Sequence, residues 1–303
     1  MAFIFEPGFF SSEPVHVAFV IGGVTAIVSA IVGVFTVVRG QSFAGHALTD
    51  VATTGGSGAF FYNLSPLLGF LSAGVLGGGA MELVGVDRVR GRDVATGVVL
   101  GFATGLSALF LYLDTTKSAT TGVSQQILFG SIFALGPSTI PIAVVTGAVT
   151  LAIVAVIYRP LLLSSISPDL ASARGVHVGL VGLLFMLSLA AAVGLSAISI
   201  GSILSTALLI GPAATTLRLT SRLRRAIIWS CVMGVLATWL GVLLAYDSYY
   251  WFPSSQGLPV SFFIVALIFV SYLLSGLPVL RRRADRRAPE STSRPLARSV
   301  EAV

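Results

Sequence analysis

The sequence predicts an all-helical protein that crosses a membrane many times. Its 303 residues are 55% hydrophobic and only 10% charged, whereas a typical soluble domain carries about 25% charged residues. The apolar residues fall in runs of about 20, the length that a helix needs to cross the hydrocarbon core of a bilayer. The basic residues are confined to short segments between those runs and to the end of the chain. Together these observations indicate an all-α polytopic membrane protein with eight or nine transmembrane helices.

The apolar runs place the spans in order along the chain. We expect them at about 15–38, 42–62, 66–86, 94–113, 139–158, 178–197, 201–217, 226–246 and 260–280. A further apolar run at 124–135 is too short to cross a bilayer, so it is expected to be a re-entrant or interfacial helix. The membrane domain is therefore predicted at 15–280.

The arginines predict the orientation of these spans. If nine spans alternate, nearly all basic residues between them lie on one side, and Lys117 alone is assigned to the other side. The positive-inside rule then puts segment 1–14 outside and the C-terminus in the cytoplasm. The pI near 10.0 therefore reflects topology in a cytoplasmic membrane and does not indicate a nucleic-acid partner. The basic, Pro- and Ser-rich segment 281–303 is expected to be a disordered cytoplasmic tail.

The second span is unusually polar for a helix in lipid, because it carries His46 and Asp50 among several threonines. Ionisable groups are costly in hydrocarbon and usually face protein or water. At a spacing of four residues, both side chains project from one face of the helix. Imidazole and carboxylate suit a divalent ion such as zinc, manganese or iron. The alternative is that His46 lies near the interface and pairs with Asp50 only to satisfy it.

The segment 159–178 contains the signature of a short helix between two spans. Ser167 is a helix cap, Pro168 takes the first position, Asp169 lies in the first turn, and Gly175 is a stop. Such a helix is expected on the cytoplasmic side, either as a docking site for a partner or as a plain interfacial helix. Later in the chain, Gly211 and Pro212 interrupt an apolar span, which indicates either a kink that acts as a gate or a packing feature.

No catalytic motif is present in the sequence. It contains no G-x-x-x-x-G-K-[ST] phosphate loop, no H-E-x-x-H and no G-x-S-x-G. The chain is therefore not expected to be a P-loop ATPase or a hydrolase of those classes. Its single cysteine, Cys231, excludes an intrachain disulfide and a cysteine-based metal motif.

Four runs resemble the membrane permeases of ATP-binding-cassette importers for zinc, manganese and iron, the ABC-3 family. The resemblance extends from about residue 15 to residue 280, and its carriers are GVFTVVR at 33–39, LFGSI at 128–132, SPDLASARGV at 167–176 and STALLIGPAAT at 205–215. It implies the permease fold of the metal- and cobalamin-importer type, in which the cytoplasmic loop is a coupling helix that docks on the ATPase. The positions that it assigns to this docking are Pro168, Asp169, Ala171, Arg174 and Gly175.

The resemblance also implies a metal pathway through the second span. Family members read G-D-A-L-S-H there, whereas this chain reads Gly45-His46-Ala47-Leu48-Thr49-Asp50, so the two ligand types are exchanged but remain four residues apart. The expected cargo is zinc or manganese, with iron as a third choice. No permanently bound cofactor is expected, and ATP would bind a partner.

The resemblance further implies three partners: a cytoplasmic ATPase dimer, a second permease copy and an extracytoplasmic metal-binding protein. The alternative from a different class is a secondary transporter driven by protons or sodium, with His46 and Asp50 as its relay.

Overall fold

The computed structural model describes residues 9, 12–85, 89–118, 122–130, 132–251 and 257–287, and every regular element within these ranges is a helix. The elements are α1 (Glu13–Val38), α2 (Ser42–Phe61), α3 (Pro66–Gly85), α4 (Val89–Ser118), α5 (Gly122–Phe129), the 3₁₀-helix η2 (Ile132–Ala134), α6 (Thr139–Ile166), α7 (Pro168–Ala173), α8 (Val178–Ile200), α9 (Ser202–Leu219), α10 (Leu223–Trp251) and α11 (Val260–Arg287). Six of the described helices are long and apolar enough to cross a membrane: α1, the 96–116 part of α4, α6, α8, α9 and α10. The helical membrane fold predicted from composition is confirmed.

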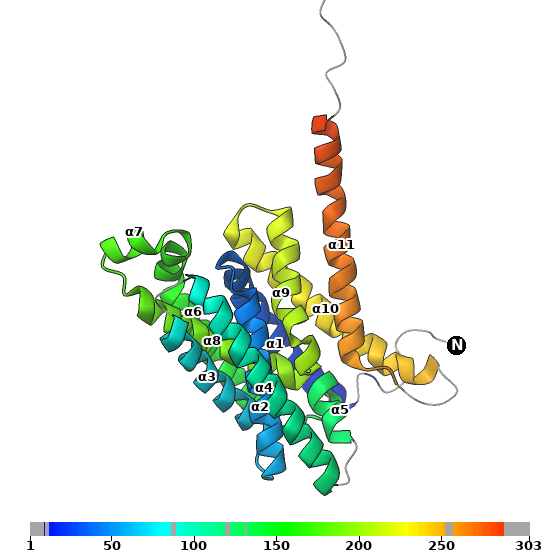
Figure 1. The fold of residues 1–303 in the computed structure, drawn as a ribbon. Helices are drawn as coiled ribbons and strands as arrows, with labels where there is room; N and C mark the ends of the chain where they lie inside the picture. Colours follow the sequence, from blue (N-terminus) through cyan, green and yellow to red (C-terminus); the bar gives the residue numbers. More distant parts are fainter. Residues whose placement is uncertain are drawn as a thin grey trace, which may run out of the picture.

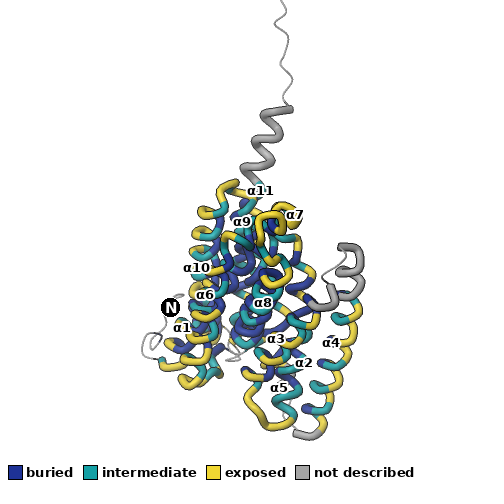
Figure 2. The backbone as a smooth tube through the Cα atoms, turned by 90° about the vertical axis from the view of Figure 1, so that its left-hand side faces the viewer, coloured by how far each residue is buried: buried dark blue, intermediate teal, exposed yellow. Residues whose placement is uncertain are grey.

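Helices α1 and α8 form the centre of the bundle. In their most apolar stretches 72% and 67% of the residues are buried, whereas the corresponding figure for α4 is 17%. The remaining long helices surround this pair, with α6 and α9 against both of them, α10 against α1, and α3 against α8 (Figures 1 and 2). The outer surfaces of the surrounding helices carry exposed Leu, Val and Phe side chains, as expected for helices whose outer faces meet lipid.

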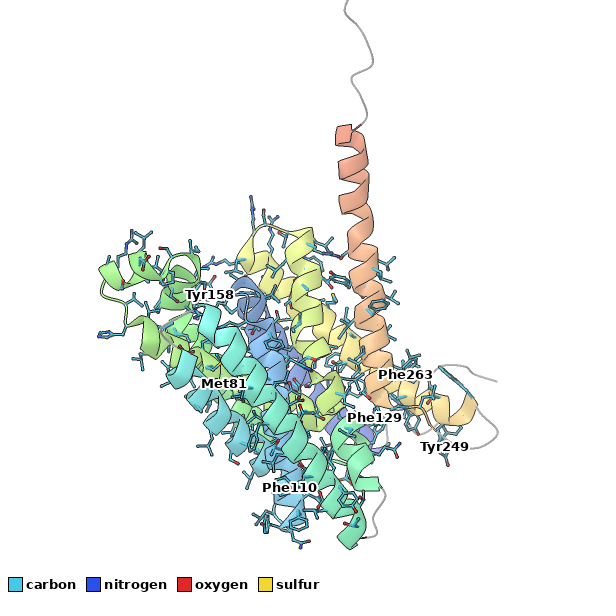
Figure 3. The ribbon with its side chains drawn as sticks, in the orientation of Figure 1. Met81, Phe110, Phe129, Tyr158, Tyr249 and Phe263 are labelled. Carbon is cyan, nitrogen blue, oxygen red and sulfur yellow. The ribbon has the colours of Figure 1, made fainter. Side chains whose placement is uncertain are left out.

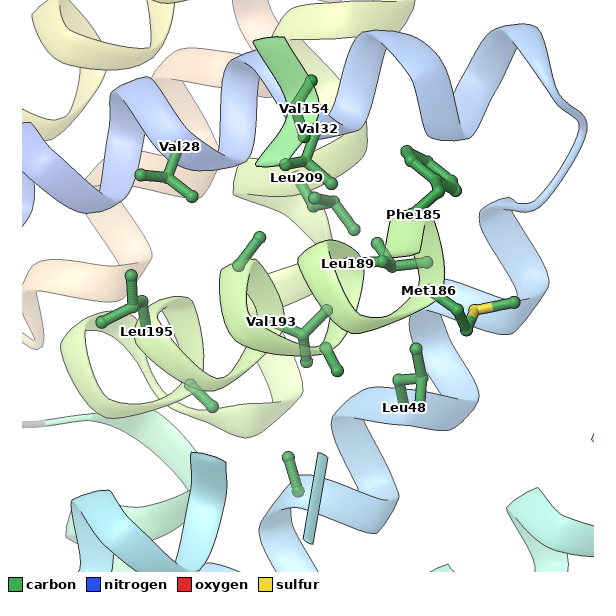
Figure 4. Close-up of a cluster of buried hydrophobic side chains, with 14 of the residues drawn as sticks. Val28, Val32, Leu48, Val154, Phe185, Met186, Leu189, Val193, Leu195 and Leu209 are labelled. Carbon is green, nitrogen blue, oxygen red and sulfur yellow. The ribbon is translucent and has the colours of Figure 1, made fainter. Parts of the chain in front are cut away.

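The largest buried cluster joins α8 to six other helices, α1, α2, α3, α5, α6 and α9 (Figure 4). Its members include Val28 and Val32 of α1, Leu48 of α2, Val154 of α6, Phe185, Met186, Leu189, Val193 and Leu195 of α8, and Leu209 of α9. The first half of α2, where the candidate metal ligands lie, therefore packs on the best-buried part of the subunit.

Hydroxyl pairs and one glycine hold the central helices at close distance. Ser29 and Ser196 hydroxyls lie 2.7 Å apart across the α1–α8 interface, and those of Thr25 and Ser199 lie 3.1 Å apart. Such interhelical hydrogen bonds contribute about 0.6 kcal/mol each on average in membranes. Gly33 of α1 lies directly against the backbone carbonyl of Leu209 in α9, so a methyl group there would overlap that oxygen.

Each predicted span overlaps one observed helix, and several helices are longer than predicted. Helix α6 continues to Ile166 through Pro160, so the predicted loop at 159–178 begins with eight helical residues. This continuation is stabilised by packing, because Leu161 is fully buried and Ser164 nearly so. Helix α11 extends to Arg287, so the first seven residues of the expected tail, 281–287, are helical; residues 288–303 lie outside the described residues.

The short run at 124–135 does not form a span. It comprises α5 and η2, which are joined at Gly130 and lie at the end of the bundle opposite α7 (Figure 1). Gly130 has φ of 74° and Gly201 has φ of 88°, and their backbones touch, because a Cβ on either would overlap the other's main chain. Only glycine tolerates both this conformation and this approach. The chain thus reverses between α8 and α9 at a single residue, and the LFGSI run lies directly against that reversal.

The arginines of the described connections gather at the α7 end of the bundle. The α1–α2 turn, α7 and the α9–α10 turn all lie at this end (Figure 1). At the opposite end, where Figure 3 labels Tyr249 and Phe263, Tyr249 and Trp251 of α10 are exposed, and the rings of Trp251 and Phe263 lie 6.2 Å apart. This distribution is what the positive-inside rule and an interfacial aromatic belt lead one to expect.

Candidate metal pathway and docking helix

Helix α2 satisfies most of its polar groups within itself. The hydroxyls of Thr49, Thr53 and Ser57 each donate to the backbone carbonyl four residues earlier, at 3.0, 2.7 and 2.9 Å. This back-bonding lets a Thr- and Gly-rich segment remain helical away from water. The side of α2 that carries these groups is buried, and Gly45 lies against Leu209 of α9. The polar character of α2 is therefore compatible with a position inside the bundle.

His46 and Asp50 lie one turn apart in the first half of α2, in line with Thr53 and Ser57 seven residues further on, but they are less buried than those two residues. His46 is exposed and Asp50 is partly exposed, so both side chains are accessible from outside this subunit. No hydrogen bond joins them in the described part of the chain, which does not support the interpretation that Asp50 serves only to satisfy His46. The predicted shared face is thus observed, whereas a direct His46–Asp50 pair is not.

The Asp50 carboxylate is held by α4. The Thr104 hydroxyl lies 2.7 Å from Asp50 Oδ2 and 2.8 Å from the backbone carbonyl of Leu100, and it can donate its proton to either. Thr54 and Ser107 hydroxyls lie 2.7 Å apart across the same interface, and Ser107 also reaches the backbone carbonyl of Asp50 at 3.2 Å. These contacts fix α4 against the stretch of α2 that contains the carboxylate.

One copy of the chain offers two protein ligands at this place. The described residues contain no group of three or more His, Cys, Asp or Glu side chains placed to share a metal ion. A closed structural site normally has four protein ligands. His46 and Asp50 alone therefore do not make a closed metal site.

The turn that leads into α2 is tied to the end of α6. Arg39 donates to the side-chain oxygen of Gln41 at 3.3 Å, and its Nη1 lies 3.1 Å from the hydroxyl of Ser164 and 3.4 Å from that of Ser165. Its guanidinium also stacks 5.3 Å above the ring of Phe185. Because α7 begins at Pro168, Arg39 connects the start of α2 to the segment immediately before α7.

Helix α7 has the boundaries that its sequence predicts. The Ser167 hydroxyl accepts a hydrogen bond from the backbone N–H of Leu170 at 3.3 Å, and Gly175 ends the segment with φ of 78°. Pro168, Asp169, Arg174 and Gly175 are exposed at the end of the bundle. Ala171 differs from these four positions because its side chain is fully buried. Ala171 therefore anchors α7 to the bundle, and the others form its outer surface.

Gly211 and Pro212 lie within α9, which is assigned as one continuous helix from Ser202 to Leu219. A Cβ at Gly211 would overlap the side chain of Ile268 in α11, and Pro212 is buried. The glycine thus permits close packing of α9 on α11. Of the two readings of this pair, these contacts favour the packing feature.

A family model matches residues 11–275, which is most of the chain, and its description is the ABC 3 transport family. The chain belongs to this family. The resemblance that the four sequence runs indicated is confirmed.

Two relatives and one solved structure illustrate the similarity. The chain is 28% identical over 265 residues to the manganese import system permease protein ScaB of Streptococcus parasanguinis, covering 88% of this chain and 90% of that protein. It is 23% identical to the high-affinity zinc uptake system membrane protein ZnuB of Haemophilus influenzae, over 76% of this chain and 88% of that protein. The structure of PsaBC from Streptococcus pneumoniae in complex with Fab matches with a TM-score of 0.75 and 26% identity, over 89% of this chain and 93% of that one.

Two residues of this region escaped the sequence analysis. Thr104 lies in an ordinary apolar span, and nothing in its surroundings distinguishes it from other threonines. Arg39 belongs to one of the four runs, but its contacts with Ser164 join residues 125 positions apart. Only the packing of α2 on α4, and of the α1–α2 turn on α6, brings these partners together.

Proposed function

We propose that this chain is the membrane-spanning permease subunit of an ATP-binding-cassette importer that carries a divalent transition metal, manganese in the first place and zinc in the second. Support comes from the family match over residues 11–275 and from relatives named for manganese import and zinc uptake. The observation that carries the proposal is the exposed His46–Asp50 pair on one side of α2. Oxygen and imidazole ligands suit both metals.

The metal site is completed by a second copy of the chain. Each copy supplies one imidazole and one carboxylate on a surface that it leaves uncovered, and two copies related by a two-fold axis supply four ligands. Thr104 holds the Asp50 carboxylate in place before the ion arrives. A site shared between two subunits also opens when the subunits move apart, which is what release of a transported ion requires.

The energy comes from a separate ATPase, because the sequence contains no phosphate-binding loop of its own. The exposed surface of α7, formed by Pro168, Asp169, Arg174 and Gly175, docks on that ATPase. An extracytoplasmic binding protein delivers the metal at the α5 end of the bundle. The chain itself performs no covalent chemistry, so it is a transporter subunit of the plasma membrane and not an enzyme.

The test is metal uptake into proteoliposomes that contain this chain, its co-purified ATPase and a cognate binding protein. Manganese, zinc and iron are compared with and without ATP. We expect ATP-dependent accumulation of manganese or zinc, its loss in Asp50→Asn and His46→Gln, and unchanged uptake in the matched control His177→Gln. His177 is exposed before α8, away from α2.

Three outcomes would contradict parts of the proposal. Uptake that follows a proton or sodium gradient and ignores ATP would establish a secondary transporter instead. ATP-driven uptake that survives Asp50→Asn and His46→Gln would leave the importer standing but remove its metal site from α2. An assembled complex that moves none of the three metals would require a different cargo.

A further inference from the structure

A groove runs along the outside of the bundle between α10 and the helices α9 and α11. It has a volume of about 700 Å³, within the range of small-molecule sites in proteins. In Figure 1, α11 diverges from the neighbouring helices toward the α7 end. Leu267 and Ser271 of α11 line the groove. Its wall along α10 is formed by Trp229, Val232, Met233, Leu236 and Leu240.

One end of this groove is positively charged. Arg225 lines it at the α7 end, and three hydroxyl residues, Thr216, Thr220 and Ser271, line it nearby. The hydroxyls of Thr216 and Ser271 already donate to backbone carbonyls of their own helices, at 2.9 and 2.7 Å. Within the described part of the chain, no hydrogen bond or ion pair engages the Arg225 guanidinium. The guanidinium is therefore the group at this end that can bind an anion.

The groove has the length of one bilayer leaflet. Arg225 and Leu240, the two ends of the α10 wall, are fifteen residues apart, which corresponds to about 22 Å at 1.5 Å per residue. Half of a bilayer of about 40–45 Å, headgroups included, is about 20–22 Å. Trp229 follows Arg225 by one helical turn along α10. With Arg225 at the headgroups, this position suits an aromatic side chain at the membrane interface. A headgroup at Arg225 would thus place its acyl chain along Val232 to Leu240.

We infer that this groove binds one anionic phospholipid from the leaflet at the α7 end, with its phosphate on Arg225 and an acyl chain against α10. Charge complementarity favours this occupant over a second copy of the chain. An apolar protein face placed over Arg225 would desolvate the guanidinium without compensation, whereas a lipid phosphate pairs with it and leaves it at the membrane surface. Arg218, the residue before Leu219, is already engaged because its guanidinium stacks 4.1 Å from the centre of the Tyr272 ring.

Trp229 provides a direct readout of this site. The chain has three tryptophans, so Trp239→Phe with Trp251→Phe leaves Trp229 as its only tryptophan within reach of brominated lipid. The complex is reconstituted in vesicles in which brominated phosphatidylglycerol or brominated phosphatidylcholine replaces part of the host lipid, and quenching is measured. We expect phosphatidylglycerol to quench at about fivefold lower mole fraction, the factor expected from one basic residue at a lipid surface. Arg225→Gln should abolish this preference.

The matched control is Arg224→Gln, because Arg224 is also exposed at the start of α10 but does not line the groove. It should retain the preference. Since Trp239 donates a hydrogen bond to the backbone carbonyl of Phe19, native mass spectrometry of the otherwise unaltered complex provides a second measurement, in which bound phosphatidylglycerol should be lost in Arg225→Gln alone. Equal quenching by both lipids would overturn the inference in favour of non-selective lipid contact. No quenching by either lipid would show that protein covers the groove.

Discussion

Replacing Arg39 by glutamine tests whether the turn before α2 links this helix, which carries the proposed metal ligands, to α7, the proposed docking helix. Arg39 contacts Ser164 and Ser165 at the end of α6 and stacks on Phe185 of α8. Glutamine is too short to keep these contacts and carries no charge. If the ATPase displaces α7, the end of α6 that precedes it moves as well. Arg39 is the observed side-chain connection between that end of α6 and the start of α2.

The size of the effect follows from the contacts that are lost. A hydrogen bond from a charged donor contributes about 1.5–3 kcal/mol, and a cation over an aromatic ring contributes about 0.5–1 kcal/mol at a partly exposed site. The contact of 3.4 Å to Ser165 is long and adds little. Because Arg39 is partly exposed, we take the lower ends, which together give about 2 kcal/mol. A loss of this size weakens the link roughly 30-fold.

The assay measures metal uptake and ATP hydrolysis in the same proteoliposomes. We expect Arg39→Gln to assemble with the ATPase and to hydrolyse ATP while uptake falls at least tenfold. Arg222→Gln is the control, since Arg222 is exposed in the α9–α10 turn at the same end of the bundle. In a double-mutant cycle, Ser164→Ala should add little to Arg39→Gln. Normal uptake in Arg39→Gln, or fully additive effects in the cycle, would refute the link.

Three further substitutions test the packing and the docking helix. Gly33→Ala should destabilise the chain by about 1–3 kcal/mol, because the added methyl group would overlap the backbone carbonyl of Leu209. Thermal unfolding in detergent should show this loss. The control Gly97→Ala, which has open space around it, should not lower the unfolding temperature. Gly175→Val should uncouple ATP hydrolysis from uptake, because φ of 78° strains a β-branched residue; wild-type coupling would argue against docking through α7. Asp114→Asn should raise the unfolding temperature, since both carboxylate oxygens are buried without a hydrogen-bond partner in the described chain; an unchanged or lower temperature would contradict this.

The fold could be predicted from composition and charge because a bilayer restricts the choices. A chain this apolar must satisfy its backbone inside helices, and the apolar runs mark where these helices lie. The helix ends were less predictable. Leu161 is buried against neighbouring helices, and such packing extends α6 past Pro160 although proline usually weakens a helix. Contacts between distant segments decide these boundaries, and no local pattern reports them.

The candidate site was predictable only as far as a single helix extends. His46 and Asp50 share a face because residues four positions apart project from the same side of any α-helix. The residues that contact this part of the chain come from other helices. Thr104 of α4 contacts the Asp50 carboxylate, and Ser164 of α6 contacts Arg39 in the turn before α2. Ala171 shows the same limit, since its position in the docking segment was predicted but its burial depends on how α7 rests on the bundle.

The hydrogen bond between Thr104 and Asp50 suits a carboxylate that must be both positioned and available. The Thr104 hydroxyl has one proton and two acceptors within reach, Asp50 Oδ2 and the carbonyl of Leu100. In the proposed site, an ion at Asp50 would let the hydroxyl turn to Leu100 and remain satisfied, so the carboxylate is released without leaving the Thr104 donor unpaired. A lysine or arginine in place of Thr104 would hold Asp50 by charge and compete with the metal. A neutral hydroxyl with a second acceptor positions the ligand and does not compete, which matches a site that holds its ion only in transit.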